Sequence, residues 1–185
     1  MSNVLIGIIG VVLFIGLAIA GVLILGSDFL NATSESRAAA AVTQSMQVAQ
    51  AVTMFNMKSG SPFVAANTTD PFLNLRPRFL KTVPVNPVQS NIPVRGYDAN
   101  GQMSGRTTMV LISFDISNQS RDICLAAARD SGMVFDNGTN TTIPTTTTGA
   151  YPRDARGRLF HAGCYESKAA FGAIPANRYH IFQQV

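Results

Sequence analysis

The hydrophobic pattern begins with a long apolar run at the start of the chain. No residue over positions 4–26 is charged or strongly polar. A helix of that length would be about 34 Å long, and the hydrocarbon core of a bilayer is about 30 Å thick. The run therefore predicts a transmembrane helix. It contains no proline, and its glycines would allow close contact with neighbouring helices.

A second pattern follows over residues 33–58. Apolar residues recur every three or four positions, which predicts an amphipathic helix: Ala38, Val42, Met46, Ala49, Val52 and Phe55. No Gly or Pro occurs over residues 27–59, so the two stretches are expected to form one helix from near residue 3 to near residue 58, roughly 80 Å long. Ser59, Gly60 and Pro62 are expected to end it.

The remaining residues, 59–185, predict a head with short strands and one helix. Six prolines make residues 60–106 rich in loops. Ser117 or Asn118 can cap a helix over residues 119–130, and residues 136–149, rich in Thr and Asn, are expected to be an exposed loop. Strands are expected over residues 79–85, 92–97, 107–116, 133–135 and 177–185, and an ordered segment from residue 159 to Cys164.

The order of these elements predicts an α+β fold. The helix over residues 1–58, apolar over 1–26 and amphipathic over 27–58, is expected to pack on a mainly antiparallel β-sheet. Residues 59–185 would form a globular head with a disulfide-bounded C-terminal region. With the apolar run set aside, about 150 residues remain, enough for one domain with a core.

Charge changes this picture little. Charged residues make up 13% of the chain, with a formal net charge of +4, against roughly 25% in average soluble domains. So few charges indicate a surface covered in part by other copies of the chain. The densest basic group, Arg153, Arg156 and Arg158, is interpreted as a solvated loop, because binding to DNA would need a continuous basic patch.

The chain shows no pattern typical of an enzyme. It has two histidines, His161 and His180, and ten acidic residues in no paired motif. A glycine-rich phosphate loop is absent from the sequence. We therefore predict a non-catalytic protein without cofactor or metal.

Two cysteines, Cys124 and Cys164, lie 40 positions apart. This spacing does not fit a zinc site, which needs more ligands at closer spacing. In a domain held outside the cytoplasm the natural interpretation is one disulfide, worth roughly 4 kcal/mol in the chain-entropy model. Two buried free thiols are the alternative.

Taken together, these features resemble the bacterial type IV pilins of the type IVb class. The resemblance covers the whole architecture, beginning with the apolar and amphipathic halves of one N-terminal helix. The segment Val83-Pro84-Val85-Asn86-Pro87 is similar to the junction before the sheet in these proteins. The helix containing Cys124 and the late Cys164 are similar to the disulfide that bounds their C-terminal region.

The resemblance implies a structural subunit of an extracellular pilus filament, held in the inner membrane before assembly. It would polymerise through its apolar helix with itself, aided by the pilus assembly machinery and the prepilin peptidase. Such filaments support adhesion, motility, conjugation or DNA uptake, and meet host or bacterial cell surfaces, phage or DNA. The residues expected to pack the filament core are Gly7, Gly10, Phe14, Gly16, Leu17 and Gly21.

The start of the chain departs from the pilin pattern in one residue. Leu5 stands where these pilins carry a Glu that pairs with a neighbouring N-terminal amine. Met1 is expected to be the processed, methylated terminus of a chain already trimmed of a basic leader, unless processing differs. Two alternatives stay open: a minor pilin or pseudopilin, and a single-span membrane-anchored binding protein that faces away from the cytoplasm.

Overall fold

The computed structural model of this chain describes residues 2–65, 70–82, 84–133, 142–146, 151–154 and 156–185. Side chains are described for all of these except residues 2–6, 22–25 and 27. The chain forms two compact units, Met1–Thr33 and Ser34–Val185. Helix α1 (Ser2–Ser59) runs through the boundary between them.

Helix α1 is the single long helix that the sequence predicts, and its end has a clear cause. Gly60 has a φ of +67°, and its amide donates to the carbonyl oxygen of Asn56 at 3.2 Å. A glycine adopts this left-handed conformation without steric cost, which is why helices often end there. In the part of the chain whose side chains are described, no helix is both long and apolar enough to cross a membrane.

Within the unit Ser34–Val185, one face of α1 is buried. The buried positions recur every three or four residues and carry small or β-branched side chains: Ser34, Ala38, Ala41, Ser45, Val48 and Val52. Such side chains let a helix backbone come close to its neighbours. The opposite positions, among them Thr43, Gln47 and Gln50, are exposed.

Five strands form one sheet in the order β1-β2-β5-β4-β3. Their bounds are β1 Arg95–Tyr97, β2 Met109–Asp115, β3 Thr145–Thr146, β4 Ala162–Ser167 and β5 Arg178–Gln184. Strands β1, β2, β5 and β4 pair antiparallel, whereas β3 pairs parallel to β4.

The fold is thus α+β, and the sheet is mainly antiparallel, as expected, with one parallel pair that makes it mixed. The difference comes from Thr145 and Thr146, which sequence reasoning placed in an exposed loop. They form β3 by pairing with Glu166 and Ser167. Two threonines alone show no alternation of apolar and polar residues, so no sequence pattern predicted this strand.

Several other expectations can be compared directly. The strands expected over 107–116 and 177–185 are β2 and β5, and the expected strand over 92–97 is reduced to β1. The described residues of 79–85 form no strand. A short 3-10 helix, η1 (Leu73–Leu75), lies just before them. Of the strand expected over 133–135, two residues lie outside the described ones, as does most of the segment 136–149.

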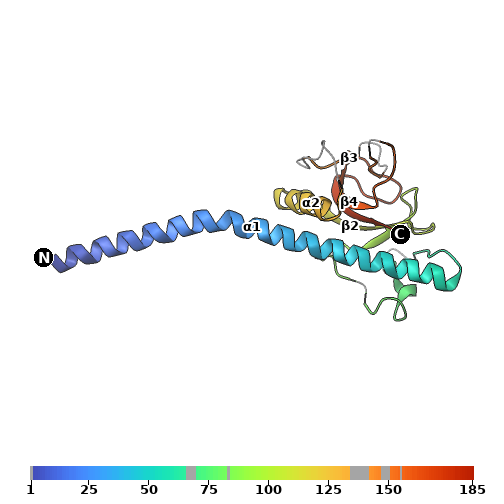
Figure 1. The fold of residues 1–185 in the computed structure, drawn as a ribbon, viewed down its shortest axis with the longest axis horizontal. Helices are drawn as coiled ribbons and strands as arrows, with labels where there is room; N and C mark the ends of the chain where they lie inside the picture. The colour runs from blue at the N-terminus through green and yellow to red at the C-terminus, as the bar shows by residue number, and fades with distance from the viewer. Residues whose placement is uncertain (1, 66–69, 83, 134–141, 147–150, 155) are drawn as a thin grey trace. The chain divides into compact units, whose positions relative to one another are not determined.

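Helix α2 (Asn118–Asp130) is capped by Ser117, one of the two residues predicted for that role. The Ser117 hydroxyl oxygen accepts from the Ser120 amide at 3.1 Å, which satisfies one of the free donors at a helix start. Its buried positions include Ile123, Cys124 and Ala127. Figure 1 shows α2 beside the strands of the sheet.

The core of this unit lies around β2 and β5. Strand β2 is buried at every position but the last, Asp115. A strand buried over such a run has both of its faces covered, because successive side chains point to opposite faces of the sheet. The core therefore continues on both sides of the sheet centre.

Candidate functional site

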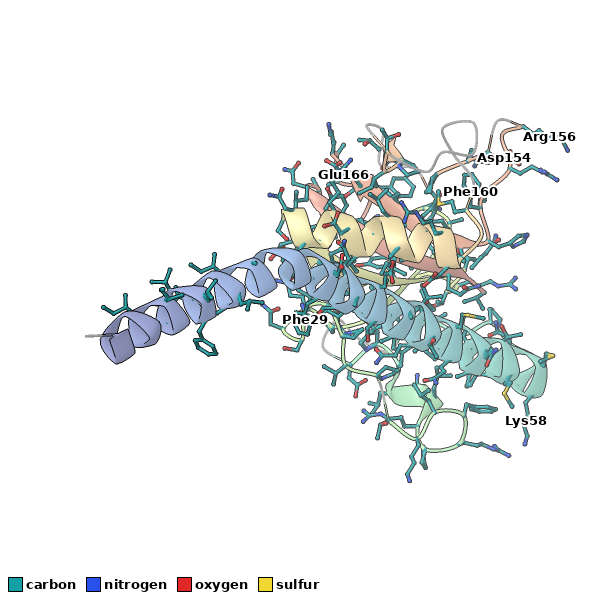
Figure 2. The ribbon with its side chains drawn as sticks, turned by 60° about the vertical axis from the view of Figure 1, so that its left-hand side comes forward. Phe29, Lys58, Asp154, Arg156, Phe160 and Glu166 are labelled. Atoms are coloured by element: carbon teal, nitrogen blue, oxygen red, sulfur yellow. A yellow bond between two sulfur atoms is a disulfide. The ribbon has the colours of Figure 1, made fainter. Side chains whose placement is uncertain are left out.

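The first candidate surface is the apolar stretch of α1 in the unit Met1–Thr33. Its described large side chains are all between 51% and 75% exposed: Ile8, Ile9, Val11, Val12, Leu13, Phe14, Ile15, Leu17 and Ile19. Figure 2 shows apolar side chains projecting from this part of the helix. Contiguous apolar surface on this scale marks a site of interaction, because single exposed apolar residues are ordinary and continuous ones are not.

Five of the six residues predicted to pack a filament core share one face of this helix. Gly7, Gly10, Phe14, Leu17 and Gly21 follow each other at steps of three and four residues, the spacing of a helix–helix contact seam. Phe14 and Leu17 are 75% and 73% exposed, the highest values in this stretch. The face therefore presents two large side chains flanked by glycines.

Gly16 does not belong to that face. It lies nine positions after Gly7, and at about 100° per residue this places it on the opposite side of the helix. A Cβ added at Gly7, Gly10, Gly16 or Gly21 would meet no atom within 4 Å, so the glycines are open in this chain. Met1, the predicted processed terminus, lies outside the described residues.

The disulfide predicted from the two cysteines is present. Cys124 on α2 and Cys164 on β4 are joined at an S–S distance of 1.98 Å, and both are fully buried. The alternative of two free thiols is therefore wrong. The bond ties α2 to the β4 strand and closes a loop of 40 residues.

A buried polar network at the sheet centre was missed by sequence reasoning. His180 on β5 is fully buried. Its Nδ1 lies 2.8 Å from Ser113 Oγ on β2, and its Nε2 lies 2.9 Å from Ser167 Oγ on β4. The signal in the sequence was weak: Ser113 is the one polar residue inside the apolar run of β2.

The direction of the hydrogen bonds fixes the protonation of this histidine. The Ser167 hydroxyl donates to the Pro175 carbonyl oxygen at 2.8 Å, so its oxygen accepts from His180 Nε2–H. Nδ1 then accepts from the Ser113 hydroxyl. A neutral imidazole satisfies both contacts, and burial lowers the pKa of His180 to about 4. The network is closed to solvent and links three adjacent strands.

The three arginines of the basic group, Arg153, Arg156 and Arg158, are exposed around Asp154, as the sequence suggested. The Asp154 carboxylate accepts from the amides of Arg156 and Arg158 at 2.9 and 2.8 Å, and from Arg158 Nε at 3.0 Å. The Arg158 amide, first among these, lowers the pKa of Asp154. One of the three arginines is thus neutralised locally.

The described residues contain no group of three or more His, Cys, Asp or Glu side chains placed to hold a metal ion. A comparison of this chain with protein-family models, curated proteins and solved structures found no match. The function has to be argued from the surfaces and contacts described above.

Proposed function

We propose that this chain is the structural subunit of an extracellular filament of the type IV pilus kind. Copies polymerise through the apolar stretch of α1, and the unit Ser34–Val185 supplies the outer part of the filament. The apolar helix is kept in the inner membrane before assembly. Adhesion, motility, conjugation and DNA uptake are the roles that such a filament would serve.

One observation carries the proposal: residues 7–21 form a helix whose large apolar side chains are more than half exposed. Burying one such side chain fully contributes about 1.5–3 kcal/mol relative to water. Nine of them in one stretch are a strong drive toward an apolar environment. A bundle of the same helices provides that environment in a filament.

The seam of Gly7, Gly10, Phe14, Leu17 and Gly21 supports helix-on-helix packing as the form of that bundle. A large side chain of one copy can enter the space that a glycine leaves on another. A helix that only had to dissolve in lipid would have no need for this arrangement. The disulfide supports the proposal in a second way, because disulfides persist in oxidising compartments outside the cytoplasm.

Electron microscopy of the fraction sheared from producing cells tests the proposal. We expect abundant thin filaments composed mainly of this chain, identified by intact mass. The mass also reports whether the terminus is methylated. A chain found wholly in the membrane fraction, without filaments, would favour the anchored binding protein instead, and a rare component among other subunits would favour a minor pilin.

A pair of substitutions at Phe14 sharpens this test. Phe14→Asp places a charge in the contact seam, and burying an unpaired charge costs several kcal/mol, so we expect filaments to be lost. Phe14→Leu keeps an apolar side chain and should assemble at near-normal yield. Both variants should leave the thermal midpoint of the head unchanged; equal yields for the two would contradict the proposal.

A further inference from the structure

The net positive charge of the chain is concentrated in one segment. Residues 58–97 contain five basic residues and one acidic residue, Asp70, which gives this segment a net charge of +4. The rest of the chain contains nine basic and nine acidic residues. The formal net charge of +4 is therefore that of residues 58–97 alone, and the basic group at 153–158 lies in the balanced remainder.

An aromatic cluster holds this segment against the end of α1. The ring centroid of Phe55, in the last turns of the helix, lies 5.4 Å from that of Phe63 and 5.6 Å from that of Phe79. Phe63 also stacks on Phe72, with 6.1 Å between the ring centroids. Figure 1 shows the segment that contains η1 beside the end of α1. Side chains near these rings are thus brought together although they are far apart in the sequence.

Four exposed cations lie around this cluster and form what we call the basic surface: Lys58, Arg78, Lys81 and Arg106. Lys58 lies at the end of α1, three residues after Phe55 (Figure 2). The Arg78 guanidinium lies 5.9 Å from the ring centroid of Phe79, and Lys81 follows three residues later. Arg106 is held beside Val64, the residue after Phe63, by an antiparallel bridge.

The basic surface has no acidic partner within the described part of the chain. None of the ion pairs found there includes one of its four residues. Asp70, the acidic residue of the segment, pairs with Arg76. Neighbouring like charges without a counter-charge create a positive potential that attracts anions. A second copy does not supply the missing charge, because its acidic and basic residues outside 58–97 balance.

The chemistry of this surface fits a phosphate backbone. Guanidinium and ammonium groups form strong, charge-assisted hydrogen bonds with phosphate oxygens. The four rings of the cluster are buried or half-buried, so the surface offers charge without an exposed platform on which unpaired bases could stack. Duplex DNA carries one negative charge per about 1.7 Å of its axis, and contact with its backbone leaves the bases stacked.

We propose that the basic surface binds the phosphate backbone of duplex DNA without preference for sequence. This inference rests on the proposed filament function for its biological role, and it names the partner that the head would meet and the residues that would meet it. Four cations in contact with four phosphates release the counterions of those phosphates. Binding should therefore weaken steeply as the salt concentration rises.

The salt dependence of binding tests the proposal in the full chain dispersed in a neutral detergent. The probe is a short fluorescent DNA duplex of mixed sequence, followed by anisotropy. Each phosphate contact contributes about −0.9 to the slope of the logarithm of the association constant against the logarithm of the salt concentration, so four contacts predict a slope of about −3.6. A slope near zero, or no binding at low salt, would overturn the proposal.

Two pairs of substitutions locate the contact. Arg78→Gln with Lys81→Gln removes two of the four contacts, so the slope should fall to about −1.8 and the affinity at low salt at least tenfold. The matched control, Arg153→Gln with Arg156→Gln, removes the same charge from the group at 153–158 and should keep the slope. Equal losses in the two pairs would show that net charge alone acts, and would overturn the assigned surface.

Two further measurements separate this proposal from its alternatives. Heparin, a sulfated polysaccharide, is the competing kind of polyanion; displacement of the duplex at a much lower concentration of charge would assign the surface to a polysaccharide instead. Filaments of the unsubstituted chain should sediment the duplex, and filaments that leave it in the supernatant would overturn DNA as their partner. Absence of filaments would overturn the filament function, but not the binding measured in the dispersed chain.

Discussion

Two apolar stretches of this chain differ in burial: one lies in the core and the other is exposed. Residues 7–21 and residues 109–114 both lack charge. The second stretch is strand β2, buried along its length between its neighbours β1 and β5. The first is a helix whose large side chains are more than half exposed. Apolar character alone therefore does not place a segment in the core of its own chain.

The two stretches differ in which residues can pair with them or cover them. Strand β2 pairs with Gly96 and Ile181 among others, residues of the same chain. Residues 7–21 form all their backbone hydrogen bonds within the helix, and only their side chains remain to be covered. Other copies can therefore cover the apolar side chains of a helix without leaving its polar backbone groups unsatisfied.

The largest expected effect is on the stability of the head and leaves residues 7–21 unchanged. Replacing both cysteines, Cys124→Ser with Cys164→Ser, should lower the free energy of unfolding of the head by about 4 kcal/mol, because a 40-residue loop is no longer closed in the unfolded chain. The thermal midpoint should fall by roughly 10 °C. Circular dichroism melting measures it.

Assembly provides the control for this change. At temperatures where the double variant stays folded, filament yield should match that of the unsubstituted chain, because the cysteines lie outside residues 7–21. A midpoint that does not move, in the variant or after reduction, would show that the disulfide contributes nothing to stability.

The next effect is a dependence of the stability of the head on pH. The pKa of His180 is about 4 in the folded chain and about 6.5 in an unfolded one. Below pH 6.5 the unfolded chain therefore binds a proton that the folded chain does not. The stabilising contribution of His180 is complete above pH 6.5 and is lost progressively as the pH falls to 4, by about 3 kcal/mol in total.

Urea denaturation at several values between pH 7 and pH 4 measures this loss. His180→Gln removes the titrating group and should flatten the dependence, although it weakens the head at pH 7. An equal slope in the variant and the unsubstituted chain would rule out His180 as the cause. Residues 7–21 contain no titratable side chain, so contacts made by them alone should not follow this curve.

The smallest effect concerns single glycines. Gly10→Leu adds a side chain to the contact seam, and overpacking costs typically 1–3 kcal/mol. The concentration needed for assembly should rise about tenfold, as measured by sedimentation. Gly16→Leu, on the opposite face, should have less effect, and a larger effect at Gly16 would show that the seam is on the wrong face. The melting of the head should not change, since a Cβ at either glycine meets open space.

Local features of the fold were well predicted from the sequence. Helix α1 was expected to end near Lys58 and ends at Ser59, because Gly60 and Pro62 disfavour its continuation. Helix α2 was expected from its serine cap and begins one residue after Ser117. Signals of this kind act within a few residues, so they can be read from the order of residues alone.

Apart from the disulfide, the features that depend on distant pairing were not predicted. Strand β3 exists because Thr145 meets Glu166, and the network of His180 exists because Ser113 and Ser167 lie on the two neighbouring strands. The basic surface likewise needs Arg106 beside Val64. In each case the interacting residues are far apart in the sequence.

By itself the sequence determined the long helix, the helix cap, the main strands and the charge-free stretches, since each follows from local backbone preference and periodicity. Only the tertiary structure decided which distant segments of the chain bury residues 109–114. The physical reason is that burial depends on strand pairing and packing between residues far apart in the chain. Residues 109–114 obtain such partners in β1 and β5, whereas the large side chains of residues 7–21 stay exposed in the single chain.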